Sequence, residues 1–224
     1  MGKCLFVTGT GTDVGKTYVA ALIVKKFRDL NISAGYYKAA ASGEEIEKIP
    51  ADVFRVKKVA GLTDDMNKCF SYSYKNSVSP HLAAQIEKRP IDFAVIERDF
   101  LNAKSRYDFL TVEGSGGIIC PLRRDDKEIL MLDDLIIRLN LPAVIVVDSK
   151  LGEINSAVLT TEHLRTKQIP INGLIFNRYD ENNLMHRDNK SVIEEITGLK
   201  TLAVVHKNSD SLDIEPEILT NLYS

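Results

Sequence analysis

One segment near the amino terminus constrains the fold of this chain more than any other. A short apolar strand signal at residues 5–7 is followed by the glycine-rich run GTGTDVGKT at residues 9–17 and then by an amphipathic stretch. Glycines allow several backbone amides to point into one cavity, and the positive end of the following helix adds to the attraction for a polyphosphate. In such a loop Lys16 reaches the terminal phosphates and the Thr17 hydroxyl binds Mg²⁺. The segment therefore predicts a phosphate-binding loop for a purine triphosphate with Mg²⁺.

The spacing of this loop differs slightly from the usual one. A glycine normally stands at the position that Thr10 occupies, so the loop is one residue longer when it is counted from Gly9. A glycine-rich turn that only starts a helix is the simpler alternative. The order of strand, glycine-rich loop, Gly-Lys-Thr and amphipathic helix favours the phosphate loop.

Alternating strand and helix signals follow the loop. Runs of β-branched and aromatic residues predict strands at residues 5–7, 34–38, 109–112, 143–147, 171–176 and 202–205. Several runs are apolar at consecutive positions, which is typical of strands that are covered on both faces in a parallel sheet. Helical periods lie between them, for example Phe93, Ile96 and Phe100 with Asp92 as the amino-terminal cap. The pattern predicts an α/β fold, a single doubly wound and mostly parallel sheet with helices on both faces, in one domain of residues 1–224.

Two segments fit this scheme poorly. Residues 41–75 carry many charges and few sheet signals, although residues 52–60 are compatible with a helix. The chain after His206 is polar and weakly patterned. Loops of this length carry function or are simply solvated, and both interpretations stay open for the two segments.

The charge balance and the cysteines exclude several classes of function. The chain has 29 Lys and Arg against 31 Asp and Glu, a formal charge of −2, so it has no overall attraction for nucleic acid or for an anionic membrane. Cys4, Cys69 and Cys120 are too few and too scattered for a disulfide framework. The longest apolar run, residues 142–147, is far too short to span a bilayer. These features predict a cytoplasmic protein with no nucleic-acid partner and no membrane partner.

Three charged residues after the loop are candidates for the chemistry. Lys38 ends the second strand and is expected beside the phosphate site, where a cation stabilises charge on a transferring phosphoryl group. Glu113 ends the next strand, a place where an acidic residue normally serves the metal of a phosphate-loop protein. Asp52 is either a third metal ligand or a helix cap, and its local sequence favours the cap. A solvated lysine and a plain glycine turn are the alternatives for Lys38 and Glu113.

Seven short motifs follow one another in a recognisable order. They are VGKT at residues 14–17, YK with ASG within residues 37–43, Asp52 at the head of a helix, SPHLAA at residues 79–84, VEGSGG at residues 112–117 with PL at 121–122, KLGEIN at residues 150–155, and NGLIFNR at residues 172–178. Each motif alone is weakly diagnostic. Together they cover most of the chain and resemble the dethiobiotin synthetase family of biotin biosynthesis.

The resemblance implies a ring closure that depends on ATP and Mg²⁺. In the family, 7,8-diaminononanoate reacts with CO₂ or bicarbonate to give a carbamate, ATP phosphorylates the carbamate, and the second amine closes the ureido ring of dethiobiotin, with release of ADP and phosphate. By the same resemblance Lys38 and Lys16 are catalytic, and Thr17, Asp52 and Glu113 serve the metal.

The resemblance also implies two sets of contacts. The nucleotide-binding residues are Thr12, Asp13, Val14, Gly15, Lys16, Thr17, Tyr18, Asp52, Glu113, Gly114, Ser115, Gly116, Phe176 and Asn177. The substrate-binding residues are Thr12, Ser42, Leu151, Gly152, Ile154 and Asn155. In the family the segment around Gly152 comes from the neighbouring subunit, so a homodimer with shared sites is expected. The motifs span residues 9–177 and leave little room for a separate substrate domain, which agrees with that expectation.

Base recognition is where this chain departs from the family. Asn177 is suited to pair with an adenine edge, because its amide both donates and accepts hydrogen bonds. The family follows its last strand with an Ile-Pro type segment, but residues 204–207 are VVHK here. Gly11 and Asp13 replace an Asp and a Glu of the family's loop, and Ala39 replaces a proline. We expect phosphate and metal binding to survive these changes and adenine selectivity to weaken.

Three other functions fit the sequence less well than the synthetase does. A partitioning-type ATPase that acts as a nucleotide switch commonly has a second lysine where this chain has Thr10. A small-molecule kinase needs arginines that close over ATP, and the candidates Arg123 and Arg124 fit a solvated loop better. A GTPase would show Asn-Lys-x-Asp, which does not occur. The synthetase explains the most motifs, although it leaves His81 without a chemical role.

Overall fold

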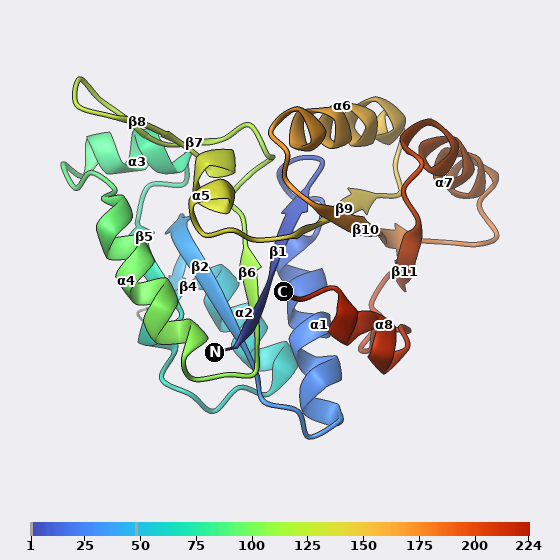
Figure 1. Cartoon of the computed structure of the whole chain (residues 1–224), viewed down its shortest axis with the longest axis horizontal. Coiled ribbons are helices and arrows are strands. Elements are labelled where there is room, and N and C mark those ends of the chain that lie inside the picture. The colour runs from blue at the N-terminus through green and yellow to red at the C-terminus, as the bar shows by residue number, and fades with distance from the viewer. Residues whose placement is uncertain (1, 48) are drawn as a thin grey trace.

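Seven parallel strands form the central sheet of the computed structural model, which describes residues 2–47 and 49–224 (Figure 1). In spatial order they are β11 (Thr201–His206), β10 (Ile171–Tyr179), β9 (Ala143–Asp148), β1 (Lys3–Gly9), β6 (Phe109–Glu113), β2 (Ala34–Ser42) and β5 (Phe70–Tyr74). All six strands expected from the sequence are confirmed, but β2 continues to Ser42, so Lys38 lies within this strand and not at its end as expected. The seventh, β5, lies in the segment that showed few sheet signals, because its serines and aromatic residues alternate instead of forming an apolar run.

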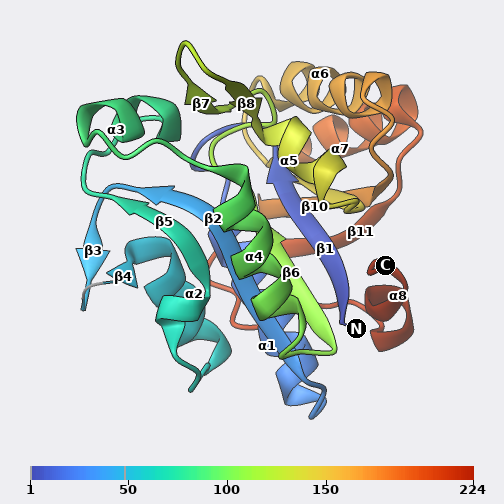
Figure 2. The same cartoon turned by 60° about the vertical axis from the view of Figure 1, so that its left-hand side comes forward.

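Helices cover both faces of this sheet. One face carries α1 (Lys16–Asp29), α2 (Ala51–Ala60) and α8 (Pro216–Asn221). The other carries α3 (Pro80–Ile86), α4 (Phe93–Lys104), α5 (Leu132–Arg138), α6 (Glu153–Thr166) and α7 (Leu184–Thr197). Figure 2 shows α4 lying across β2 and β6 on this second face. Adjacent strand residues enter opposite cores, as Phe6 and Val7 do on β1, which is why the strands read as continuous apolar runs. The doubly wound α/β prediction is confirmed.

The two segments that fitted the predicted scheme poorly, before β5 and after β11, also contain secondary structure. A hairpin of β3 (Glu45–Ile46) and β4 (Ile49–Pro50) precedes α2, and a short 3₁₀ turn, η1 (Met66–Lys68), leads into β5. The end of the chain returns to the α1 face of the sheet, where the Tyr223 ring meets Phe27 and Phe109 edge-on. Ser224 exchanges backbone hydrogen bonds with Cys4 at the start of β1. The weakly patterned tail is therefore part of the core.

A second hairpin lies over the opposite core. It is formed by β7 (Pro121–Arg124) and β8 (Ile129–Met131), and Figure 1 shows it beside α3. The expectation that Arg123 and Arg124 belong to a solvated loop is wrong about the loop, because both end β7, although Arg124 is exposed to solvent. Arg123 is mostly buried and forms ion pairs with Asp125 and Glu128, so the turn of the hairpin neutralises its charge.

Two expected helix caps have different outcomes. Asp92 caps α4 as predicted, since its carboxylate accepts a hydrogen bond of 2.9 Å from the backbone N–H of Ala94. The cap expected at Asp52 is wrong. Helix α2 begins at Ala51 after Pro50, and Asp52 lies in its first turn with the carboxylate directed to Lys38 instead of to the helix backbone. The attraction of a buried cation decides this orientation.

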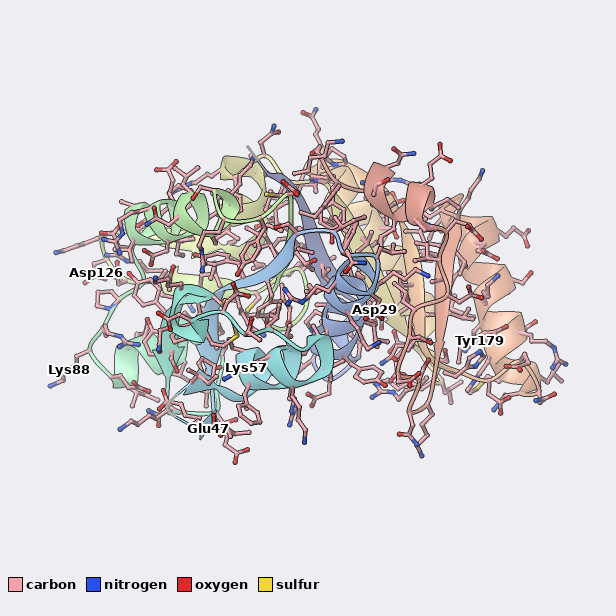
Figure 3. All side chains as sticks on the ribbon, turned by 90° about the horizontal axis from the view of Figure 1, so that it is seen from below. Asp29, Glu47, Lys57, Lys88, Asp126 and Tyr179 are labelled. Carbon is pink, nitrogen blue, oxygen red and sulfur yellow. The ribbon has the colours of Figure 1, made fainter. Side chains whose placement is uncertain are left out.

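Charged side chains lie on the outer surface of the molecule. Figure 3 shows the labelled side chains of Glu47, Lys88 and Asp126 at the periphery, and all three residues are exposed. Within residues 2–47 and 49–224 no helix is both long and apolar enough to cross a membrane.

Candidate active site

The register of the sheet brings the site residues together. Glu113, the last residue of β6, lies directly opposite Lys38 on β2 and opposite Val7 on β1. The phosphate loop begins where β1 ends, at Gly9. The strand order reverses direction at β1, which lies between β6 on one side and β9 on the other. Ligands of open α/β sheets bind at the carboxyl ends of the strands beside such a point.

The phosphate loop has the backbone conformation that a polyphosphate site needs. Gly15 has φ of +97° at the start of α1, and a Cβ atom there would overlap the side-chain amide of Asn177. Only glycine fits this position without strain. The Lys16 ammonium folds back over the loop and donates a hydrogen bond of 2.7 Å to the carbonyl of Gly11. Burial lowers the pKa of Lys16, and the nearby Glu113 carboxylate acts in the opposite direction.

A buried lysine between two carboxylates forms the centre of the site. The Lys38 Nζ lies 2.6 Å from Asp52 Oδ2 and 2.8 Å from Glu113 Oε1, and its side chain is 6% exposed. Burial alone would lower the pKa of Lys38, but the Glu113 and Asp52 carboxylates raise it above its ordinary value. For Asp52, burial would raise the pKa, but Lys38, Arg55 and Thr17 together lower it below its ordinary value. Lys38 is therefore protonated at neutral pH.

The same cluster contains oxygen donors that suit Mg²⁺. The Thr17 hydroxyl donates a hydrogen bond of 2.7 Å to Glu113 Oε1, the oxygen that also faces Lys38. In the part of the chain that the structure describes, no group of three or more His, Cys, Asp and Glu side chains is arranged to hold a metal by itself. Mg²⁺ characteristically takes one or two carboxylates and completes its shell with phosphate oxygens and water. A hydroxyl and two carboxylates beside a phosphate loop fit that requirement.

Two clefts meet at Lys38. The phosphate-loop cleft has a volume of about 430 Å³ and contains the loop, the start of α1 and Asp52. The serine-lined cleft, of about 580 Å³, is walled by Ser42, Ser77 and Ser115. The residues that line both clefts are Thr12, Asp13, Lys38, Asp52 and Gly116. The arrangement places two adjoining binding spaces on either side of one buried ammonium group.

Most of the expected nucleotide contacts lie in the phosphate-loop cleft. Those that line it are Thr12, Asp13, Gly15, Lys16, Thr17, Tyr18, Asp52, Glu113 and Gly116, and Lys38, expected as a catalytic residue, lines it as well. Val14 and Phe176 are buried in the two apolar cores instead. Gly114 is packed between Phe6 and Leu132. Asn177 is 3% exposed, and its Nδ2 donates a hydrogen bond of 2.9 Å to the Val14 carbonyl. The side chain therefore packs against the buried side of the phosphate loop.

The expected substrate contacts divide into two groups. Thr12 and Ser42 line the serine-lined cleft, as Ser115 does, and the Ser42 and Ser115 hydroxyls donate to the carbonyls of Val78 and Ala40. The described residues Leu151, Gly152, Ile154 and Asn155 line neither cleft. The Leu151 side chain is instead 82% exposed at the start of α6.

A polar network that the sequence did not reveal ties α6 to the phosphate loop. The Thr10 hydroxyl donates a hydrogen bond of 2.5 Å to Glu153, the first residue of α6. Arg178 donates two hydrogen bonds to Asp148, at 2.8 and 2.6 Å, and one to the backbone carbonyl of Asp13. The two loop residues, Thr10 and Asp13, lie more than 140 positions in the sequence from their partners, Glu153 and Arg178. A single sequence shows the charges but not their pairing.

Other side chains at the site were also missed. Arg55, one turn after Asp52 on α2, lines the phosphate-loop cleft and is exposed. Tyr36 lies beneath the cleft, fully buried, with its hydroxyl on Glu113. From the sequence, Tyr36 and its neighbour Tyr37 could be predicted only to lie in a strand. Nothing in the local sequence indicates which of the two faces of the sheet contains a carboxylate.

The parallel sheet, the glycine-rich loop and the lysine with two carboxylates define a phosphate-loop nucleotide-binding protein. An AAA domain model matches residues 3–214 of the chain. Solved structures agree with the fold. A ParA family ATPase from Chlorobium tepidum TLS superposes with a TM-score of 0.58 at 14% identity, over 94% of this chain and 87% of that one. A MinC–MinD cell division complex from Aquifex aeolicus gives 0.54 at 13% identity, over 99% and 86%. At these identities the likeness concerns the fold alone.

The chain belongs to the family of ATP-dependent dethiobiotin synthetases. It is 49% identical over 205 residues to the ATP-dependent dethiobiotin synthetase BioD of Brachyspira hyodysenteriae, covering 92% of each chain. It is 44% identical over 226 residues to BioD of Clostridium botulinum, covering 100% of this chain and 99% of that relative. BioD of Clostridium perfringens is 41% identical over 94% of this chain and 93% of its own length.

The paired charges of the cluster make the stability of the metal-free protein depend on Asp52 and on pH. Because the pKa of Asp52 is lowered in the folded state, its stabilisation is present above the ordinary carboxyl pKa, about 4, and disappears as the pH falls through the lower folded value. We expect Asp52→Asn to lower the free energy of unfolding by about 1–3 kcal/mol at pH 7, because one partner of a buried ion is lost. The difference from wild type shrinks below about pH 4.

Urea denaturation with a chelator present, at several pH values within the folded range, measures this difference. Asp29→Asn is the matched control, because Asp29 pairs with Lys25 in an exposed i,i+4 ion pair. That change is expected to cost less than about 0.5 kcal/mol. A difference for Asp52→Asn that stays constant down to pH 3 would contradict the lowered pKa.

Proposed function

We propose that this chain is an ATP-dependent dethiobiotin synthetase that works with Mg²⁺. The observation that carries the proposal is the position of Lys38, a buried and protonated lysine at the junction of the phosphate-loop cleft and the serine-lined cleft. A reaction that joins a carbamate to a phosphoryl group must bring two anions together, and a fixed cation between their binding spaces offsets the repulsion. Family membership supports the same function.

The proposed reaction has three bond-forming steps. One amine of 7,8-diaminononanoate attacks the carbon of CO₂ and loses a proton, which gives a carbamate. A carbamate oxygen attacks the γ-phosphorus of ATP, and ADP leaves with the electron pair of the broken P–O bond. The second amine then attacks the carbonyl carbon, expels inorganic phosphate and loses its proton, which closes the cyclic urea. Phosphorylation is needed because the carbamate oxygen is otherwise a poor leaving group.

Each part of the site has a role in this scheme. We assign the loop amides and Lys16 to the triphosphate, and Lys38 to the transferring phosphoryl group and the carbamate oxygens. Thr12 and Ser42 hold the carbamate or the diamine in the serine-lined cleft. Mg²⁺, when bound by Thr17, Asp52, Glu113 and phosphate oxygens, would supply neutralisation of the phosphate charge. Positioning and electrostatics together are the main contributions expected of such a site.

The reaction itself tests the proposal. Purified protein incubated with diamine, bicarbonate, Mg²⁺ and ATP should yield the cyclic urea, detected by mass spectrometry, with one ADP formed per product. Lys38→Gln should lower kcat by about 100-fold or more, because it removes a charge that acts on the transition state. Removal of Lys38 also leaves two neighbouring carboxylates without their cation, so circular dichroism must first show that the variant is folded. ATP hydrolysis that ignores diamine and bicarbonate would exclude this function.

We also propose a homodimer in which the start of α6 completes the site of the neighbouring subunit. The support is the local structure. Gly152 is exposed and immediately precedes α6, and a helix start attracts the carboxylate of the substrate's aliphatic arm. Leu151 beside it is 82% exposed, and Ile119 at the serine-lined cleft is 66% exposed. Large apolar side chains exposed at a site are typical of a surface that a partner covers.

A change at Leu151 tests the dimer. Light scattering after size-exclusion chromatography should give roughly twice the 25.0 kDa chain mass for wild type. Leu151→Asp should shift the protein towards the monomer and raise KM for the diamine, while ATP binding is retained. Leu184→Asp is the control, since Leu184 is 72% exposed at the start of α7 and outside both clefts. A monomeric wild-type protein with full activity would refute the shared site.

The expected loss of adenine selectivity remains a prediction. Asn177 supports it, because a side chain that is 3% exposed and bonded to the loop offers little of its amide to a base. We expect turnover with GTP, CTP and UTP to lie within about tenfold of turnover with ATP, a difference near 1.4 kcal/mol. Steady-state assays with the four nucleotides at equal Mg²⁺ measure it. Strict dependence on ATP would show that groups other than Asn177 recognise the adenine base.

We further propose that residues 1–224 act as one domain and that the protein is cytoplasmic. A single seven-stranded sheet joins the early and late parts of the chain, which supports one domain. Cys4, Cys69 and Cys120 are buried free thiols, as expected in a reducing compartment.

A further inference from the structure

Tyr36 is a fully buried residue that touches the proposed metal site from the core side. It lies on β2, two residues before Lys38, and is 0% exposed. Its hydroxyl donates a hydrogen bond of 2.6 Å to Glu113 Oε2. The side chain packs in the core that also contains α1 and α2, so its hydroxyl approaches the carboxylate from below the cleft.

The two oxygens of Glu113 have different partners. Oε1 accepts from the Thr17 hydroxyl at 2.7 Å and from Lys38 Nζ at 2.8 Å. Oε2 accepts from Tyr36. Glu113 is 2% exposed, so Oε2 depends on this one phenol in place of water. The terminal torsion of a glutamate is otherwise soft and approximately two-fold, and a free carboxylate could turn either oxygen to a ligand.

We propose that Tyr36 is a positioning residue for the metal: its hydroxyl holds Oε2 of Glu113 in the core, so that Oε1 alone faces Thr17 and the cleft. The inference rests on the proposed Mg²⁺–nucleotide function of the site. Groups that orient a metal ligand tune the affinity of the metal without touching it. Glu113 then offers a single oxygen of fixed direction, which suits the strict octahedral geometry of Mg²⁺ better than a chelating carboxylate.

The next residue in the chain provides a matched control. Tyr37 points into the opposite core, where its hydroxyl hydrogen-bonds with Ser71 at 2.7 Å and with the Ile96 carbonyl at 3.1 Å. Tyr36→Phe and Tyr37→Phe therefore each remove one buried, hydrogen-bonded hydroxyl from the same strand. Only the first change reaches Glu113.

Measurements of metal affinity distinguish the effect of Tyr36→Phe from that of Tyr37→Phe. Mn²⁺ is titrated into each protein in the presence of a non-hydrolysable ATP analogue, and free Mn²⁺ is followed by electron paramagnetic resonance. We expect Tyr36→Phe to raise the Kd of Mn²⁺ about tenfold, the lower end for groups that orient a ligand, and Tyr37→Phe to change it less than twofold. Binding of the analogue without metal should be equal in all three proteins.

A double-mutant cycle distinguishes positioning from general loosening. In a Glu113→Gln background, Tyr36→Phe should weaken Mn²⁺ binding no further, because the carboxylate that it orients has gone. Should Tyr36→Phe fold poorly, Tyr36→His offers a second donor of smaller size, and its Kd for Mn²⁺ should lie between those of wild type and Glu113→Gln.

The outcomes are separable. Absence of Mn²⁺ binding by the wild-type protein with the analogue would count against the proposed metal function itself. Wild-type binding that Tyr36→Phe leaves unchanged would overturn the role of Tyr36 alone. Equal weakening by both tyrosine variants, or further weakening in the Glu113→Gln background, would also overturn it, because the effect would then come from the fold.

Discussion

The placement of one ammonium group between two carboxylates governs the site and much of the fold around it. Lys38 is buried, and an isolated charge in that position would be severely destabilising. Asp52 and Glu113 must therefore lie on either side of it, which explains why the first turn of α2 is directed at β2 and why β6 ends where it does. The oxygens that neutralise Lys38 are also the ones suited to Mg²⁺. Stability and chemistry depend on the same contacts.

Sheet order determines how the rest of the site collects around this cluster. Lys38 on β2 and Glu113 on β6 are 75 positions apart in the chain, yet the parallel register places them opposite each other. The loop after β1 brings Lys16 and Thr17 to the same edge, and Arg178 and Glu153 attach the loop to the strand ends on its other side. Contacts from several segments that are distant in the sequence therefore hold the site together.

Sequence patterns predicted the elements with strong local signals and failed where partners are distant. Continuous apolar runs identified six strands, and Asp92 was recognised as a cap because a cap is a contact within one helix turn. The edge strand β5 was missed, since its alternation of serine and aromatic residues is a weak signal beside the charges around it. The tail was missed because Tyr223 is buried only through contacts with Phe27 and Phe109. For Asp52 the local sequence alone favoured a cap over a metal ligand, because its partner, Lys38, is fourteen residues away.

The sequence by itself determined the phosphate loop, the α/β class and the identity of the family, because glycines, a lysine and strand periodicity act through neighbouring residues. It also named Lys38, Glu113 and Asp52 as the groups to consider. Only the tertiary structure decided that these three are joined, that Asn177 lies behind the loop, and that Tyr36 instead of Tyr37 reaches Glu113. The physical reason is that successive strand residues face opposite sides of a sheet, and their surroundings depend on helices far away in the chain.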